Sequence, residues 1–132
     1  MPTMNHSEVQ DWLDRYLEAW AKDDPELIAA LFTESAVYRF RPYGGDDRKA
    51  LGVEEIVRSW IEFDEDPSKW EASFRPYAVD DDRAVAVGTS RYFDAGEQGD
   101  ELYHNCFLLR FEDGRCAEFT EYWMLEPGGS EA

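Results

Sequence analysis

The chain has 132 residues, 30 acidic against 13 basic, and a formal net charge of −17. A field of this sign repels the phosphates of nucleic acids and of anionic membranes, so we expect neither as a partner. With 43% hydrophobic and 15% aromatic residues, the chain can bury a core, and its length fits a single domain, 1–132. Its apolar runs are too short to span a bilayer, and residues 1–6 lack the layout of a secretory signal, so we expect a cytoplasmic protein.

The first third of the sequence predicts two helices. Apolar residues recur at helical spacing over 9–20, and Ser7 is a plausible N-cap just before them. A second helix begins at Asp24 and Pro25, because aspartate caps a helix and proline suits its first position. Residues 33–35 are predicted to end it.

The rest of the chain predicts a strand at 36–41, a turn-rich loop at 42–47 and a third helix at 52–60. The apolar period then changes to two, which predicts strands near 70–79, 84–93, 101–111 and 115–125. Residues 126–132 are expected to form a frayed tail beyond a core of about 8–125. Helices followed by a meander of strands predict an α+β fold: a cone-shaped, curved antiparallel sheet wrapped by about three N-terminal helices around a pocket.

The last two strands are predicted to form the most informative hairpin. A three-residue loop at 112–114 would put Asn105 opposite Glu121. A two-residue loop would slip the register by one residue and put Phe107 opposite Thr120. The first register unites one nearly apolar face, which should point at the helices and comprises Tyr103, Asn105, Phe107, Leu109, Phe111, Ala117, Phe119, Glu121 and Trp123.

The opposite face of this hairpin is mixed and suits either a half-exposed surface or a homodimer interface. It carries His104, which is therefore expected at the surface, together with Cys106 and Cys116. The two cysteines are too far apart along the predicted hairpin for a disulfide, so we expect free thiols. No histidine or cysteine spacing predicts a metal site, and we expect no cofactor.

Glu121 is the candidate catalytic residue. A carboxylate on an apolar face is costly unless it is hydrogen-bonded or protonated, and such environments tune general acids and bases. The alternative is a structural role in which Glu121 pairs with an arginine near the open end of the sheet. Asn105 either orients a ligand or only satisfies Glu121.

Aromatic and small residues are expected to form the pocket wall. The hydroxyl of Tyr16 could reach the pocket from the first helix, although a tyrosine there also suits plain core packing. Gly88, Ser90 and Tyr92 share a face that would leave room for a ligand, but the other face of their strand is at least as apolar. The full set of expected wall residues is Trp20, Tyr38, Phe40, Trp60, Ser90, Tyr92, Tyr103, Phe107, Phe119 and Trp123.

The chain resembles the SnoaL-like (polyketide cyclase-like) branch of the nuclear-transport-factor-two-like superfamily. The similar stretches are YLEAW at 16–20, LFTESAVY at 31–38, GVEEI at 52–56, FEDGR at 111–115 and EYW at 121–123. The resemblance covers roughly 8–125. It implies a cone-shaped fold around a small-molecule pocket and homodimerisation through the outer sheet face. It does not imply one activity, because the superfamily includes isomerases, dehydratases, epoxide hydrolases, cyclases and domains without known activity.

Carried over residue by residue, the resemblance removes several activities. Tyr16 matches a first-helix tyrosine of the ketosteroid isomerase oxyanion hole, but the base and the neutral acid of that enzyme fall on Phe40 and Phe107. Scytalone dehydratase uses pocket histidines, whereas His104 is expected on the outer face of the sheet. The Asp–Arg–Asp arrangement of the epoxide hydrolases has no counterpart located in this sequence. An acidic residue of the cyclase type could be Glu121.

The sequence therefore predicts a protein that binds a small, largely apolar molecule. One hypothesis is a cofactor-free lyase, isomerase or cyclase in which Glu121 moves a proton while Asn105 and Tyr16 orient the substrate. The other is a non-catalytic ligand-binding or dimerisation module.

Overall fold

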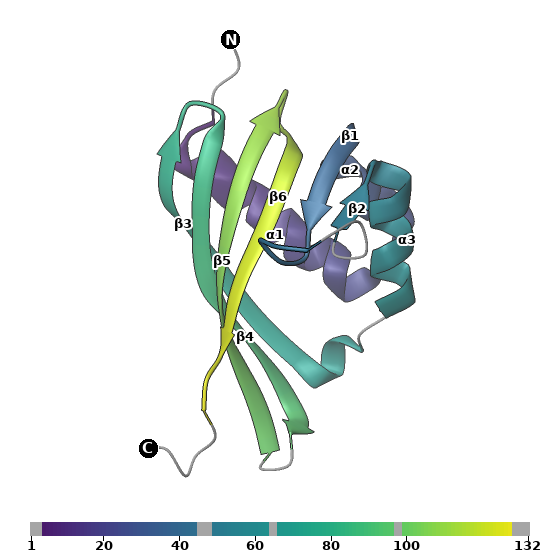
Figure 1. The fold of residues 1–132 in the computed structure, drawn as a ribbon, viewed down its shortest axis with the longest axis vertical. Coiled ribbons are helices and arrows are strands. Elements are labelled where there is room, and N and C mark those ends of the chain that lie inside the picture. Colours follow the sequence, from purple (N-terminus) through teal and green to yellow (C-terminus); the bar gives the residue numbers. More distant parts are fainter. Residues whose placement is uncertain (1–3, 45–48, 64–65, 97–98, 128–132) are drawn as a thin grey trace.

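The computed structural model describes residues 4–44, 49–63, 66–96 and 99–127 (Figure 1). Its helices are α1 (His6–Lys22), α2 (Pro25–Ala30) and α3 (Val53–Phe63), and one turn of 3-10 helix lies at Pro67–Lys69. Its strands are β1 (Phe32–Arg39), β2 (Lys49–Leu51), β3 (Trp70–Asp80), β4 (Arg83–Gly96), β5 (Gly99–Glu112) and β6 (Arg115–Leu125). The predicted α+β class and the four long C-terminal strands are confirmed.

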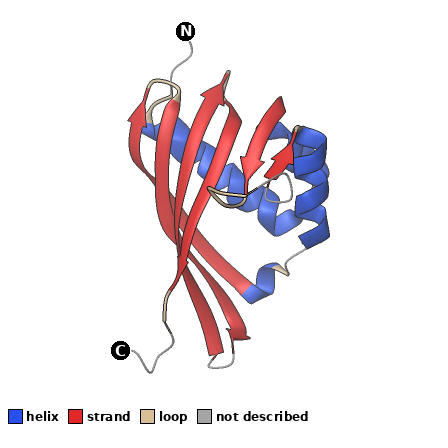
Figure 2. Cartoon of the chain, viewed as in Figure 1, coloured by secondary structure: helices blue, strands red, loops and turns tan. Residues whose placement is uncertain are grey.

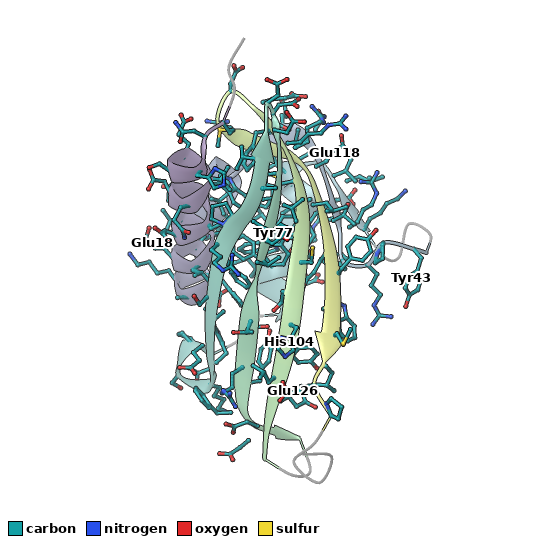
Figure 3. The ribbon with its side chains drawn as sticks, turned by 90° about the vertical axis from the view of Figure 1, so that its left-hand side faces the viewer. Glu18, Tyr43, Tyr77, His104, Glu118 and Glu126 are labelled. Carbon is teal, nitrogen blue, oxygen red and sulfur yellow. The ribbon has the colours of Figure 1, made fainter. Side chains whose placement is uncertain are left out.

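The described strands form one curved sheet in the order β2-β1-β6-β5-β4-β3. Its strand pairs are antiparallel except that β1 runs parallel to β6, a pairing that the expected meander did not include. The short strand β2, which was not predicted, adds to the free side of β1. The helices lie together on one face of the sheet (Figure 2), and Glu18 of α1 points away from that sheet (Figure 3).

Helix α1 begins two residues earlier than predicted. Asn5, not Ser7, is the N-cap: the Asn5 side chain accepts a hydrogen bond from the Glu8 N–H at 2.8 Å, and the Glu8 carboxylate accepts one from the Asn5 N–H at 3.0 Å. This reciprocal pair is a capping box, which satisfies two donors at the helix start and leaves Ser7 inside the first turn. The start of α2 is as predicted, with the Asp24 side chain accepting from the Glu26 N–H at 2.9 Å.

The end of α2 was predicted wrongly. The helix stops at Ala30 and the chain enters β1 at Phe32, within the segment expected to be the last helical turn. The Leu31 carbonyl accepts hydrogen bonds from the Cys116 N–H at 2.8 Å and from Trp12 Nε1 at 3.0 Å. These long-range bonds draw the segment onto β6, so tertiary pairing overrides the local helical pattern.

The β5–β6 hairpin has the two-residue loop that was the alternative from the sequence, but beyond Phe111 its pairing follows neither of the two registers considered. Its turn has two residues, Asp113 and Gly114, both with positive φ (52° and 81°), which is the geometry of a type I′ hairpin. An irregularity beyond Phe111 then shifts the pairing, and Phe107 faces Glu121 while Asn105 faces Trp123. The pairing therefore differs by two residues from the preferred prediction.

A shift of two residues leaves every side chain on its predicted face except near the irregularity, because the side-chain period of a strand is two. Asn105, Phe107 and Glu121 still point toward the helices. Cys116 was expected on the outer face, but it lies fully buried in the core beside the irregularity. Both cysteines are free thiols, as predicted.

Strand β3 approaches β4 closely at Gly88, which pairs with Phe74. A Cβ atom at Gly88 would lie 1.9 Å from the Ser73 carbonyl oxygen and 2.8 Å from the Phe74 Cα, so no side chain fits there. The glycine thus lets the Phe74 ring lie across the inner face of the sheet.

Candidate functional site

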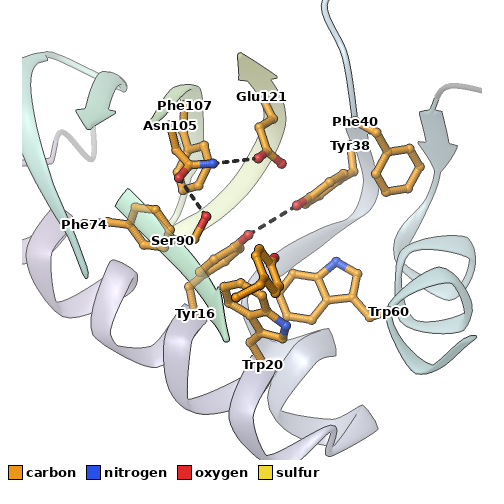
Figure 4. Close-up of a pocket in the computed structure, with 11 residues that line it drawn as sticks. Tyr16, Trp20, Tyr38, Phe40, Trp60, Phe74, Ser90, Asn105, Phe107 and Glu121 are labelled. Atoms are coloured by element: carbon orange, nitrogen blue, oxygen red, sulfur yellow. Dashed lines mark hydrogen bonds between the residues drawn. The ribbon is translucent and has the colours of Figure 1, made fainter. Parts of the chain in front are cut away.

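A cavity of about 200 Å³ lies between the inner face of the sheet and helices α1 and α3 (Figure 4). All but three of its lining residues are aromatic. The lining comprises Tyr16, Trp20, Tyr38, Phe40, Trp60, Phe74, Ser90, Tyr92, Asn105, Phe107 and Glu121.

Most residues expected in the pocket line this cavity, including the three assigned catalytic roles. Three expected wall residues do not. Phe119 is fully buried behind the wall, where its ring stacks on Tyr38 at 4.3 Å. Trp123 is 44% exposed, with the Arg41 guanidinium 5.6 Å from its ring centroid, and Tyr103 packs edge-on against it at 5.5 Å. Trp123 pairs with Asn105, but its ring contacts Tyr103 and Arg41 instead of the cavity.

The structure also decides between the two faces of β4. Ser90 is buried and lines the cavity with Tyr92, so the face that also carries Gly88 points inward. Phe74 was missed from the sequence. The alternation of β3 could have proposed it, but only the close contact at Gly88 brings its ring to the cavity.

The polar groups of the cavity form a chain of hydrogen bonds (Figure 4). The Ser90 Oγ donates to Asn105 Oδ1 at 3.0 Å, and Asn105 Nδ2 donates to Glu121 Oε2 at 3.1 Å. This chain fixes the orientation of the amide, because a carboxylate accepts and cannot donate to the amide oxygen. Ser90 on β4 and Asn105 on β5 are both buried. Their hydrogen bonds therefore fix the position of the carboxylate of Glu121, which lies on the neighbouring strand β6.

Two tyrosine hydroxyls form the other polar group. The hydroxyl oxygens of Tyr16 and Tyr38 lie 3.3 Å apart and share a hydrogen bond. Burial raises the pKa of Tyr38 well above its ordinary value, and nearby Tyr16 and Glu121 raise it further. Tyr38 therefore keeps its proton at neutral pH and can donate a hydrogen bond.

The outer sheet face carries other charged residues. His104 is exposed, as predicted, and its Nε2 lies 2.9 Å from the Glu126 carboxylate (Figure 3). Arg110 binds both Glu112 and Glu118, and its hydrogen bond lowers the pKa of Glu118.

Among the described residues, no group of three or more His, Cys, Asp or Glu is arranged to hold a metal ion. No helix of the described chain is long and apolar enough to cross a membrane.

A family model for the SnoaL-like domain matches residues 13–119. The chain belongs to the SnoaL-like domain family. No curated protein matches this SnoaL-like chain.

Solved structures support the fold of this SnoaL-like domain. An epoxide hydrolase of the LEH-like type from M. tuberculosis is 12% identical with a TM-score of 0.65, and the match covers 90% of this chain and 84% of the other. A candidate polyketide cyclase from Sinorhizobium meliloti is 19% identical with a TM-score of 0.65 (90% and 100% covered). A protein of unknown function with a cystatin-like fold from Methylobium petroleophilum is 17% identical with a TM-score of 0.70 (97% and 83% covered). At these identities the likeness shows the fold alone.

Proposed function

We propose that this SnoaL-like protein binds a small, largely apolar molecule in the aromatic cavity and transfers a proton with Glu121, as a cofactor-free lyase, isomerase or cyclase. The observation that carries the proposal is the placement of one carboxylate in an aromatic cavity, positioned by the buried amide of Asn105. Apolar walls with a few convergent polar groups are typical of small-molecule sites.

Each polar residue has a distinct role in this proposal. Glu121 is the general base, and Asn105 is a positioning residue that holds its carboxylate. Within the Tyr16–Tyr38 pair one hydroxyl donates to the other, and the hydroxyl that accepts this bond donates its own proton to an oxygen on which negative charge develops. Phe40 and Phe107, at the positions that would be base and acid in an isomerase, line the cavity but carry no proton to exchange.

The size of the cavity limits the substrate. Sites for drug-sized ligands enclose roughly 300–1,000 Å³, and this cavity of about 200 Å³ is smaller. The proposed substrate is therefore a molecule of one or two rings.

Hydrogen–deuterium exchange tests the proton transfer without knowledge of the natural substrate. The probe is 2-tetralone, a bicyclic ketone with acidic C–H groups next to its carbonyl, incubated with the protein in D₂O and followed by NMR. We expect the protein to accelerate the exchange and Glu121→Gln to lose at least about 100-fold of that acceleration, since a positioned base contributes roughly 10²–10⁴-fold.

Glu126→Gln is the matched control, because it removes one carboxylate from the exposed outer face instead of the cavity. It should exchange 2-tetralone like the wild type. Equal acceleration by the Glu121→Gln variant would exclude Glu121 as the base. Binding of 2-tetralone without any acceleration would favour the alternative, a non-catalytic ligand-binding or dimerisation module.

Exposed apolar residues on the outer sheet face favour dimerisation, alongside ligand binding in the cavity. The outer face of β5 and β6 exposes apolar side chains, with Leu108 at 41%, Tyr122 at 44% and Met124 at 69%. We propose that this face forms a homodimer interface. Sedimentation velocity should give twice the mass of the chain, and a charge introduced by Leu108→Glu should halve that mass. A monomeric wild type would contradict the interface.

A further inference from the structure

The side chain of Asn105 uses half of its hydrogen-bonding capacity inside the protein. A primary amide has two N–H donors and two acceptor lone pairs. In the described part of the chain, the Asn105 side chain accepts one bond, from Ser90 Oγ at 3.0 Å, and donates one, to Glu121 Oε2 at 3.1 Å. One N–H and one lone pair therefore remain, although the residue is only 8% exposed.

The strand arrangement sets the direction of these two remaining groups. Asn105 lies on β5, with Ser90 on β4 to one side and Glu121 on β6 to the other. The two bonds thus run sideways, one toward each neighbouring strand (Figure 4). Because a side chain stands roughly perpendicular to its sheet, the free end of the amide, with the remaining N–H and lone pair, points away from the strands and into the cavity that Asn105 lines.

Apolar rings border this amide. Gly88, the β4 partner of Asn105, has no side chain, and the ring of Phe74 lies over it. Phe107 follows on the same face of β5 and packs on Phe74 with 4.7 Å between the ring centroids. An unfilled N–H in such surroundings costs free energy, and a hydrogen bond to a ligand is stronger there than in water. The amide is therefore a polar recognition point in an aromatic wall.

A donor beside an acceptor matches a ligand that carries the same two groups in reverse order. A cis-amide has this pattern, because its C=O and its N–H lie on the same side of the C–N bond. Open-chain secondary amides are trans, so their two groups point in opposite directions and cannot both reach one partner. A ring forces the cis form, and a cyclic amide can therefore make both bonds.

We propose that the cavity of this protein recognises a lactam, a cyclic amide on an apolar body of one or two rings. The lactam carbonyl accepts a hydrogen bond from Asn105 Nδ2, the lactam N–H donates to Asn105 Oδ1, and the aromatic wall holds the apolar body. This inference rests on the proposed function, in which the cavity binds a small molecule, and names the polar group of that molecule.

The test compares molecules of nearly the same shape. Hydrocarbostyril is a bicyclic lactam, and 2-tetralone is the corresponding ketone, with CH₂ in place of the N–H. Binding of each is measured by NMR titration of the protein. We expect hydrocarbostyril to bind at least about fivefold more tightly, since it makes one additional hydrogen bond. N-methylated hydrocarbostyril keeps the carbonyl but has no N–H, so it should bind no more tightly than 2-tetralone.

A variant assigns the preference to Asn105. Asn105→Leu keeps the size of the side chain but has neither donor nor acceptor, so hydrocarbostyril and 2-tetralone should then bind within about twofold of each other. Glu126→Gln, the control on the exposed outer face, should keep the preference of the wild type. If thermal melting shows that Asn105→Leu is unfolded, NMR of the wild-type complex replaces it, and a nuclear Overhauser contact is expected between the lactam N–H and the amide protons of Asn105.

Failure of the lactam proposal and failure of the proposed function would look different. Equal affinity for hydrocarbostyril and 2-tetralone would overturn the lactam preference and leave the small-molecule cavity standing. Absence of binding by both molecules would overturn the lactam proposal and also count against the proposed function. A preference that persists in Asn105→Leu, or a bound lactam without the Overhauser contact, would overturn the role of Asn105.

Discussion

The hydroxyl oxygens of Tyr16 and Tyr38 lie 3.3 Å apart, although one residue belongs to α1 and the other to β1. Both residues are largely buried, and both line the cavity. Their hydrogen bond therefore ties the first helix to the sheet at the point where the two enclose the site.

Removing either hydroxyl should destabilise the fold. We expect Tyr16→Phe and Tyr38→Phe each to lower the free energy of unfolding by about 1 kcal/mol, the usual net value of a hydrogen bond between neutral groups. Because the two hydroxyls share one bond, the double variant should lose less than the sum, which urea unfolding of all four proteins would measure. Fully additive losses would show that the pair does not interact.

The raised pKa of Tyr38 predicts alkaline sensitivity. Its ordinary value is 10.0, and the folded state holds the proton more strongly than the unfolded state does. The stabilisation is complete below about pH 10, and it is lost as the pH rises above that value toward the folded pKa, because only the unfolded tyrosine ionises readily. Tyr38→Phe should therefore lose less stability between pH 9 and pH 11, roughly, than the wild type.

Thermal melting over that pH range checks this prediction. Tyr77→Phe is the control, because Tyr77 is 67% exposed on β3 and should leave the alkaline slope unchanged. An equal slope in wild type and Tyr38→Phe would contradict the role of Tyr38.

Gly88→Ala should be strongly destabilising. The new Cβ would lie 1.9 Å from a backbone oxygen and 2.8 Å from the Phe74 Cα, so two strands must move apart. Overpacking of this kind costs typically 1–3 kcal/mol and here about 3 kcal/mol or more, because backbone atoms are in the way. The midpoint of urea unfolding measures the loss, with the neighbouring Thr89→Ala as control. A loss below about 1 kcal/mol would mean that β3 does not approach β4 as described.

Glu118 should contribute stability that acid removes. The hydrogen bond from Arg110 lowers the pKa of Glu118 below its ordinary value of 4.5, and Arg39 adds to the effect. The stabilisation is thus present above about pH 4.5 and is lost as the pH falls through the lower, folded pKa. Its size is small, since the Glu118 side chain is 43% exposed and solvent screens the pair.

Comparison of the wild type with Glu118→Gln tests the pH range over which this stabilisation is lost. The wild type should be the more stable protein at pH 7, and the difference should shrink toward zero as urea midpoints are measured from pH 5 to pH 3, roughly. The difference between the proteins is the relevant quantity, because the whole acidic chain also loses self-repulsion in acid. A constant difference across this range would contradict the pairing with Arg110.

Local sequence patterns were sufficient for the three helices and the four long strands, but not for β2 or the end of α2, and for the side of the sheet on which most residues lie. The start of α2 follows from the cap at Asp24, and the four long strands follow from their period of two. The inward direction of Asn105, Phe107 and Glu121 was predicted even though the pairing was not. A strand alternates strictly, so its faces are a local property that survives a shift of two residues.

The cavity itself depended on distant contacts. The bond from the Cys116 N–H to the Leu31 carbonyl ends α2 early and brings β1 parallel to β6. The pairing shift near Cys116 then sets Glu121 against Phe107 and leaves Asn105 diagonal to it.

The sequence by itself determined an acidic α+β chain with an inward-facing asparagine and glutamate, because composition, capping and alternation are read from neighbouring residues. The sequence also predicted that Asn105 and Glu121 meet, which their hydrogen bond confirms. Only the tertiary structure decided that they meet diagonally and share a cavity with the Tyr16–Tyr38 pair. Register and helix docking arise from hydrogen bonds and packing between segments far apart in the chain, and no local pattern encodes the distance between their side chains.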